Sequence, residues 1–266
     1  MTASFPRALL GTLTLAALTA ATAFGDSGIH LCNPDLCNGT DVISHAQPPG
    51  KRVLGFHVST DGRRVIYVSN SSCRRELYSV SARGGPVIQL SDMATNVQDP
   101  CFRNVTDEFS ISPDGRYAIW EADRDATSAP AQGDQDYELF STPILGGATV
   151  QLNPPLPFDY DVEHHLVSCD SQRVIYRQGK DSSNRWELWS APIRGPETAA
   201  RRISQTMGMS QAVGPFDVRC DASVLFWADL ATGGIYLPFL TTVTGGALLQ
   251  GLLEDGFESG GTGAWH

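Results

Sequence analysis

The residues best suited to chemistry are carboxylates that gather in one stretch of the sequence. They offer hard oxygen ligands of the kind that Ca²⁺ binds, and alternation along an extended chain would bring two carboxylates to one side. The stretch lacks the ordered spacing of ligands and glycine found in an EF-hand, so a solvated acidic loop is the simpler interpretation and calcium binding is the alternative. No other cofactor is expected. The residues are Asp123, Asp125, Asp134 and Asp136.

A second acidic stretch ends in two adjacent histidines. Asp159, Asp161 and Glu163 precede His164 and His165, which suggests metal binding or acid–base chemistry. Neighbouring residues of a strand point to opposite sides of a sheet, so the two histidines cannot both serve one site. We expect a hydrogen-bonded structural histidine, and we keep Asp159 and His165 as candidate metal ligands.

Motifs of hydrolytic catalysis are absent from the sequence. It contains no Gly-x-Ser-x-Gly, no His-Glu-x-x-His and no glycine loop of the phosphate-binding kind. No catalytic residue is therefore predicted.

The elements that position these residues belong to a repeat. Four segments share an aspartate that an aromatic residue follows six positions later, and they recur at intervals of about 50 residues. Asp-Gly and Asp-Ser favour tight turns, because the carboxylate bonds nearby backbone and the next residue tolerates unusual φ. We interpret the four aspartates as turn residues of β-hairpins: Asp61, Asp114, Asp170 and Asp221.

A second hairpin follows each turn. Its first strand begins Glu-Leu-aromatic-Ser at Glu76, Glu138 and Glu187, with 234–237 as a divergent fourth copy, and each leads to a glycine turn and a short last strand. The fold class is therefore all-β, with four-stranded antiparallel units at about 53–92, 104–153, 163–204 and 215–250. Radial stacking would bury both faces of each unit. The fixed offset of the aromatic residues predicts that they pack between units: Tyr67, Trp120, Tyr176 and Trp227.

These motifs resemble the TolB-type β-propeller repeat, a WD40-like repeat whose hallmark is a Ser-Pro-Asp-Gly turn. Residues 112–115 match it fully, 59–62 lack the proline, and the copies at Cys169 and Cys220 lack both proline and glycine. The resemblance covers about 53–250 and implies a propeller of four-stranded blades. It implies no single function, because such repeats occur in scaffolds, in peptidase gating domains and in lyases.

The number of blades is left open by the sequence. Four repeats are clear, and residues 29–33 and 40–44 look like the last two strands of a further, partial blade at the N-terminus. Either a closed ring or an open one fits this count. The domain is expected to span 24–250.

Six cysteines are present, none with the spacing of a zinc site. Cys32 and Cys37 could close a small disulfide loop. Cys73 and Cys101 are expected on the same face of the propeller, and we predict a disulfide between them. We expect neighbouring blades to diverge at Cys169 and Cys220, so packed thiols are the prediction there and a bond is the alternative.

The two ends of the chain differ from the repeats. Residues 1–23 carry Arg7, an apolar run and a small-residue cleavage pattern, which predicts a signal peptide and export to the periplasm or outside the cell. The Gly-rich acidic tail, 251–266, is predicted to be exposed. It resembles a terminal segment of exported proteins of some Gram-negative bacteria, which implies a role in sorting.

Charge narrows the range of partners. The formal net charge is −10, which disfavours nucleic acid and anionic lipid surfaces. We predict an exported, non-catalytic binding or scaffold protein that presents its loops to a protein or cell-envelope component, without membrane insertion after signal cleavage. Two alternatives stay open: a metal-dependent polysaccharide lyase or hydrolase, and a surface-sorted structural protein.

Overall fold

The computed structural model describes residues 18–20, 29–33, 36–42, 44, 52–71, 74–91, 104–123, 137–157, 159–230, 236–246 and 249–250. In these ranges the chain is almost entirely β-structure, with two single-turn 3₁₀ helices, η1 (Asp181–Ser183) and η2 (Glu197–Ala199). None of the described helices is long and apolar enough to cross a membrane.

Sixteen strands form four units of four antiparallel strands, as the repeat predicts. Units 3 and 4 are joined by a single parallel bridge, Trp186 to Ala212. Unit 1 comprises β4 (Val53–Val58), β5 (Arg64–Ser71), β6 (Arg74–Ser81) and β7 (Ile88–Gln89); unit 2 comprises β8 (Val105–Ile111), β9 (Tyr117–Ala122), β10 (Glu138–Pro143) and β11 (Val150–Gln151). Unit 3 comprises β12 (Asp161–Val167), β13 (Arg173–Lys180), β14 (Arg185–Pro192) and β15 (Arg201–Arg202); unit 4 comprises β16 (Ala212–Val218), β17 (Ser223–Asp229), β18 (Tyr236–Thr242) and β19 (Leu249–Gln250).

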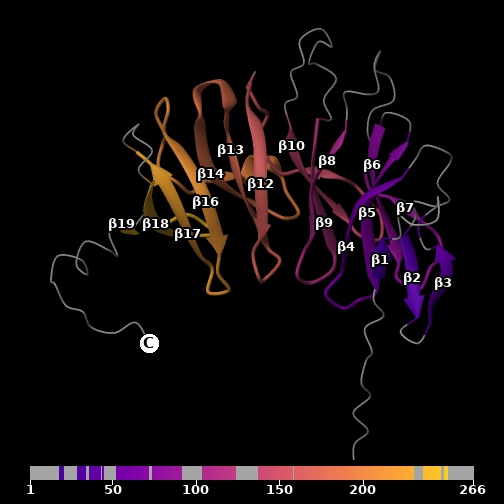
Figure 1. Cartoon of the computed structure of the whole chain (residues 1–266). Coiled ribbons are helices and arrows are strands. Elements are labelled where there is room, and N and C mark those ends of the chain that lie inside the picture. Colours follow the sequence, from indigo (N-terminus) through magenta and orange to yellow (C-terminus); the bar gives the residue numbers. More distant parts are fainter. Residues whose placement is uncertain are drawn as a thin grey trace, which may run out of the picture.

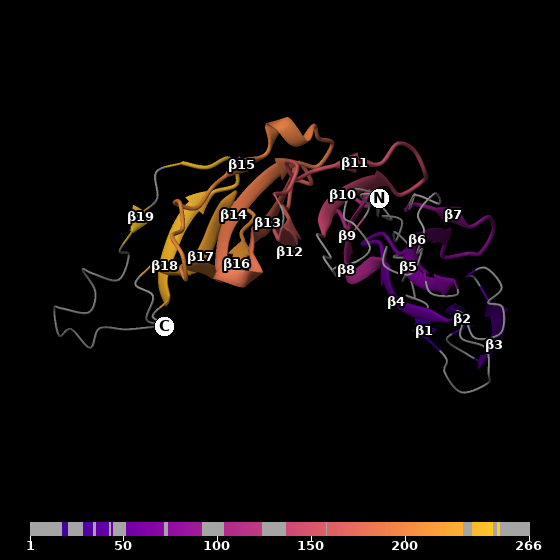
Figure 2. The same cartoon turned by 90° about the horizontal axis from the view of Figure 1, so that it is seen from above.

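The units stand side by side in an arc that does not close into a ring (Figures 1 and 2). The first strand of each unit, which we call its inner strand, lies on the concave side of the arc (Figure 2). A three-stranded sheet of β1 (Leu18–Ala20), β2 (Ile29–Asn33) and β3 (Leu36–Val42) lies beside unit 1. Strand β2 agrees with the predicted partial blade, β3 begins earlier than predicted, and β1 falls inside the predicted signal peptide.

Three apolar layers hold the arc together, one between each pair of neighbouring units. Between units 1 and 2, Ile66 and Leu77 pack in one buried cluster with Trp120. Tyr176 belongs to the cluster between units 2 and 3, and Phe226 to the cluster between units 3 and 4. Aromatic side chains bury large areas, so these layers stabilise the packing of neighbouring units.

The turn aspartates of units 1 to 3 share one local geometry. In units 1 to 3 a serine two residues earlier donates its hydroxyl to the aspartate Oδ1 at 2.6 Å. These hydrogen bonds hold the pKa of Asp61 and Asp170 below the usual value. The residue after the aspartate has positive φ in every unit, as expected for such turns: Gly62 (67°), Gly115 (70°), Ser171 (58°) and Ala222 (66°).

Unit 4 departs from the repeat by one residue. Its turn closes with a hydrogen bond from the Arg219 N–H to the Ser223 carbonyl, whereas unit 1 uses Ser59 and Arg64, one residue further apart. The turn of unit 4 is therefore one residue shorter. Side chains alternate along a strand, so the residue six positions after Asp221 points to the opposite face of the sheet from its counterparts in units 1 to 3.

The prediction that Trp227 packs between units is therefore wrong. Phe226 takes the place of Tyr67, Trp120 and Tyr176, pairs with Phe239 and stacks on it at 5.3 Å. The Trp227 side chain points away from unit 3 and is 36% exposed. The divergent fourth copy is likewise 237–240 and not 234–237, because Phe239 pairs where Tyr78 pairs in unit 1.

Cys169 and Cys220 form a disulfide, with a Cα–Cα distance of 5.1 Å. The prediction of packed thiols is wrong, because neighbouring units approach at their Asp turns instead of diverging. The residues that precede the turn aspartates meet across units 1 and 2 as well, where Thr60 Oγ1 donates to the Pro113 carbonyl at 2.9 Å. Of the other predicted pairs, Cys73 and Cys101 lie outside the described residues, and Cys32 and Cys37 lie on the paired strands β2 and β3.

Candidate functional site

The pairing of every inner strand with its neighbour is irregular at one point. The pairing register shifts between Val53 and Gly55 in β4 and between Glu163 and His165 in β12. Corresponding shifts occur in β8 and β16. Such bulges bend a strand and re-aim its side chains, and they are common beside binding sites. At the bulge in β12, His164 adopts a φ of 52°.

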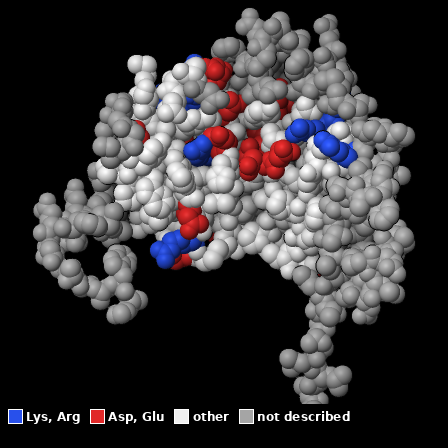
Figure 3. All heavy atoms as spheres, viewed as in Figure 1, with Lys and Arg blue, Asp and Glu red and all other residues white. Residues whose placement is uncertain are grey.

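The bulged strands place ionisable side chains on the concave side of the arc. The four inner strands contain five carboxylates and no lysine or arginine. Figure 3 looks onto this side and shows acidic side chains gathered near its middle, with basic groups beside them. We call the exposed residues at the centre of the inner strands the concave site: His57, Asp107, Glu108, Glu163 and His164.

The second and third strands supply the cations beside this site. Arg75 Nη1 lies 3.3 Å from Asp107 Oδ1, and Arg177 forms an ion pair with Glu163. Desolvation lowers the pKa of His57 and His164 below the usual value. The Glu108 carboxylate opposes this lowering without reversing it. Both imidazoles are therefore neutral at pH 7, and the site carries net negative charge.

A buried polar network lies under the concave site, between units 2 and 3. His165 Nδ1 is 2.8 Å from Glu121 Oε1, and His165 Nε2 is 2.9 Å from Ser110 Oγ. The His165 and Glu121 side chains are only 2% and 4% exposed. Burial raises the pKa of Glu121, and the hydrogen bond from His165 opposes that rise.

This network interrupts an apolar position of the repeat. Phe56, Phe109 and Phe216 occupy the position of His165 in the other inner strands, since all four pair with the interface aromatic of β5, β9, β13 or β17. An alignment of the four inner-strand sequences would have revealed the change from Phe to His in unit 3. It would not have revealed Ser110 or Glu121, which come from unit 2.

The order Ser–His–carboxylate is that of an activated nucleophile. The His165 and Glu121 side chains, however, are enclosed between two sheets and almost wholly shielded from solvent. We interpret the network as a polar lock that fixes units 2 and 3 together and so positions Glu108 and Glu163 above it. This agrees with the predicted hydrogen-bonded structural histidine.

The candidate metal ligands do not converge among the described residues. Asp159 Oδ2 accepts a hydrogen bond from Ser182 Oγ at 2.5 Å and lies 3.2 Å from Lys180 Nζ. Asp123 is buried just after β9, and Asp125, Asp134 and Asp136 lie outside the described residues. In the part of the chain that the structure describes, no group of three or more His, Cys, Asp or Glu is placed to hold a metal ion.

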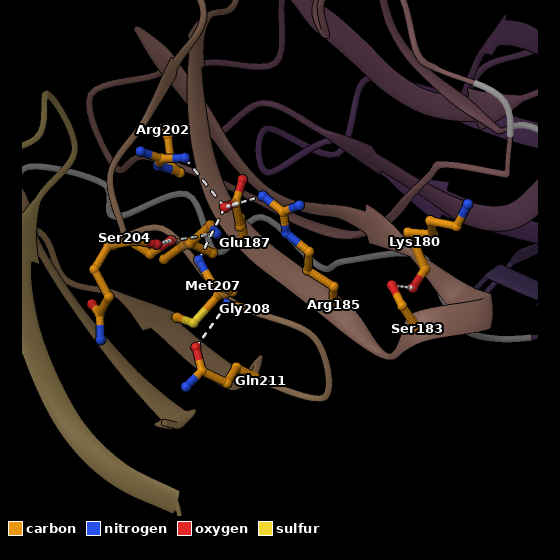
Figure 4. A network of polar contacts seen from close by, with 11 residues as sticks. Lys180, Ser183, Arg185, Glu187, Arg202, Ser204, Met207, Gly208 and Gln211 are labelled. Carbon is orange, nitrogen blue, oxygen red and sulfur yellow. Dashed lines mark hydrogen bonds and ion pairs between the residues drawn. The ribbon is translucent and has the colours of Figure 1, made fainter. Parts of the chain in front are cut away.

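Glu187, which begins the Glu-Leu-aromatic-Ser motif of unit 3, has a structural role that sequence reasoning missed. In unit 3, Glu187 Oε1 accepts hydrogen bonds from Arg185 (3.3 Å), Arg202 (3.2 Å) and the Met207 N–H (3.1 Å). Figure 4 shows Glu187 at the centre of these contacts. It thereby fixes the segment that leads to β16, and with it the inner strand of unit 4. The sequence signal was the recurrence of glutamate at the first position of three motifs, and Glu76 and Glu138 are buried as well.

No protein-family model matches the chain, and no curated protein matches its sequence. Solved structures of propeller-type proteins match its fold. Prolyl oligopeptidase B from Galerina marginata is 13% identical over 85% of this chain and 34% of its own, with a TM-score of 0.57. An oligogalacturonate lyase solved with manganese is 12% identical over 81% of this chain and 56% of its own, with a TM-score of 0.53.

A TolB protein from Agrobacterium tumefaciens is 18% identical over 79% of this chain and 64% of its own, with a TM-score of 0.46. The chain thus spans less than two thirds of the length of each of these proteins. At these identities the likeness concerns the fold alone.

Proposed function

We propose that this chain is an exported, non-catalytic binding protein that uses the concave site to hold a basic segment of a protein partner. One observation carries the proposal: the inner strands of an open arc present carboxylates and no cation of their own. Complementary charge would steer such a partner to the site and set its register there.

The polar lock and the ion pairs support this role. A rigid support lowers the entropic cost of binding, because the carboxylates are already positioned when the partner arrives. Arg75 and Arg177 hold Asp107 and Glu163 in place and leave Glu108 to meet the partner. Acidic charge over the whole chain acts in the same direction.

Export rests on the N-terminal pattern of residues 1–23, and the Cys169–Cys220 disulfide is consistent with an oxidising compartment. Calcium binding at the acidic loop stays a separate proposal. The metal-dependent lyase alternative gains no specific support from the described residues.

Capture from a cell-envelope extract tests the proposal. The mature chain and two charge variants, Glu108→Lys on the concave site and Glu197→Lys on η2, serve as baits. We expect the wild type and Glu197→Lys to retain the same partner and Glu108→Lys to retain at least tenfold less, with salt weakening the wild-type complex. Equal recovery on all three baits would refute the concave site.

A further inference from the structure

Three exposed side chains of the concave site form no hydrogen bond or ion pair with the described residues: His57, Glu108 and His164. They come from β4, β8 and β12, the inner strands of units 1, 2 and 3, which are neighbours in the arc (Figure 2). The Glu108 carboxylate is close enough to both imidazoles to oppose the lowering of their pKa. The site thus presents one free carboxylate between two imidazoles with free ring nitrogens.

Phenylalanine rings of the next unit orient the two imidazoles. The centre of the His57 ring lies 4.9 Å from that of Phe109, with 87° between the ring planes. The corresponding values for His164 and Phe216 are 5.2 Å and 70°. Edge-to-face contacts of this kind are favourable, and each restricts the rotation of an imidazole that is otherwise exposed. Both rings are therefore oriented before a ligand arrives.

The placement of the three groups favours a flat organic cation over a metal ion. Two imidazoles and a carboxylate are common metal ligands, but among the described residues no three such groups are placed to hold one ion. A cation that contacts all three groups must therefore be larger than a metal ion. A guanidinium has five N–H donors in one plane, pairs with a carboxylate through two parallel hydrogen bonds and stacks on aromatic rings. An ammonium is a compact, strongly hydrated charge.

The chain already holds a guanidinium in this manner beside the site. Arg177 forms an ion pair with Glu163, and its guanidinium carbon lies 5.2 Å from the centre of the Trp186 ring. A carboxylate and an aromatic ring thus hold the guanidinium together. Asp107 also has an arginine as its partner. Glu108 is the remaining carboxylate of the concave site.

We propose that Glu108, between His57 and His164, binds the guanidinium of an arginine in the partner's basic segment and selects arginine over lysine. The carboxylate supplies the charge. The two neutral imidazoles supply aromatic faces and hydrogen-bond acceptors that a guanidinium uses better than an ammonium does. Arginine recognition rests on the proposed function of the concave site and names the side chain that the partner must present.

Titration with two blocked pentapeptides, Gly-Gly-Arg-Gly-Gly and Gly-Gly-Lys-Gly-Gly, tests this recognition, with the imidazole NMR signals of His57 and His164 as the readout. We expect the arginine peptide to shift both signals and to bind about fivefold more tightly than the lysine peptide. Glu108→Gln should weaken binding of the arginine peptide about tenfold. Glu197→Gln makes the same change of charge on η2 and is the matched control, with wild-type affinity for both peptides.

Two further variants separate charge from selectivity. His57→Gln and His164→Asn keep Glu108 and remove one aromatic face each. Each should reduce the preference for arginine by about twofold or more and leave the affinity for the lysine peptide unchanged. Asparagine is chosen at position 164 because it tolerates the positive φ of that residue, 52°.

Equal affinity of the wild type for the two peptides, or a preference for arginine that survives in Glu108→Gln, would overturn arginine recognition. A wild type that binds neither peptide would overturn it as well. Capture from the envelope extract then separates the two proposals: a partner whose retention depends on Glu108 leaves the proposed function standing, whereas the absence of such a partner refutes both.

Discussion

At the scale of single residues, the φ angle of the residue after each turn aspartate determines the conformational strain of that turn. The position after the aspartate has positive φ in all four units, yet only units 1 and 2 have glycine there. A side chain in this left-handed conformation costs about 1–2 kcal/mol, part of which is recovered through the lower entropy of the unfolded chain. Ala222 therefore carries a strain that Gly115 avoids.

Ala222→Gly should raise the free energy of unfolding by roughly 0.5–1 kcal/mol. The reverse change, Gly115→Ala, should lower it by about 1 kcal/mol, and space is not the cause, because a Cβ there would meet Ser59 Cβ at an ordinary 3.8 Å. Urea denaturation measures both. A stabilised Gly115→Ala variant would contradict the role of the backbone angle.

The buried lock yields a sharper prediction. His165→Phe restores the residue of the other inner strands but leaves the Glu121 carboxylate buried without its partner, which should cost about 3–5 kcal/mol. Adding Glu121→Val, the residue of unit 1 at the equivalent position, should recover most of that loss. If denaturation shows the double variant to be as unstable as the single one, the two side chains do not act as a pair.

The exposed histidines predict how stability responds to pH. Desolvation lowers the pKa of His57 and His164 in the folded chain, so the unfolded chain binds more protons below the unperturbed value of 6.5. The free energy of unfolding should therefore fall as the pH is lowered from about 7 to about 5. His57→Gln and His164→Asn should each flatten this dependence in thermal melts. Unchanged slopes would show that these imidazoles titrate normally.

At the scale of elements, the disulfide joins the inner hairpins of units 3 and 4. Cys169→Ser with Cys220→Ser should lower the free energy of unfolding by about 2–4 kcal/mol. Peptide mapping of the unreduced chain should recover the two cysteines in one linked fragment. Recovery of both as free thiols, or linked to other cysteines, would contradict the pairing.

The sequence predicted correctly those elements that depend on residues close together in the chain. The turn aspartates, the glycine turns and the four antiparallel strands of each unit all follow from neighbouring residues. Trp227 was misplaced because a deletion of one residue in a turn reverses a strand's faces while leaving its aromatic pattern intact. Cys169–Cys220 and the contact of Ser110 and Glu121 with His165 depend on how units approach each other, which no single repeat encodes.

At the scale of the whole molecule, the arc gives two surfaces with different chemistry. The concave side carries the carboxylates of the inner strands, and the face of unit 4 that points away from unit 3 carries Leu225, Trp227 and Leu240. An open ring makes both accessible. The predicted propeller architecture is thus confirmed in its four-stranded antiparallel sheets, while the sheets do not close.

The central claim is that a partner binds along the inner strands, and photo-crosslinking in the native envelope tests it most directly. A photoreactive amino acid replaces Thr106, in the bulge of β8, or Leu145, on the glycine turn of unit 2. We predict a discrete crosslinked adduct from position 106 that Glu108→Lys abolishes, and none from position 145. An adduct from position 145 alone, or one from position 106 that persists with Glu108→Lys, would contradict the account.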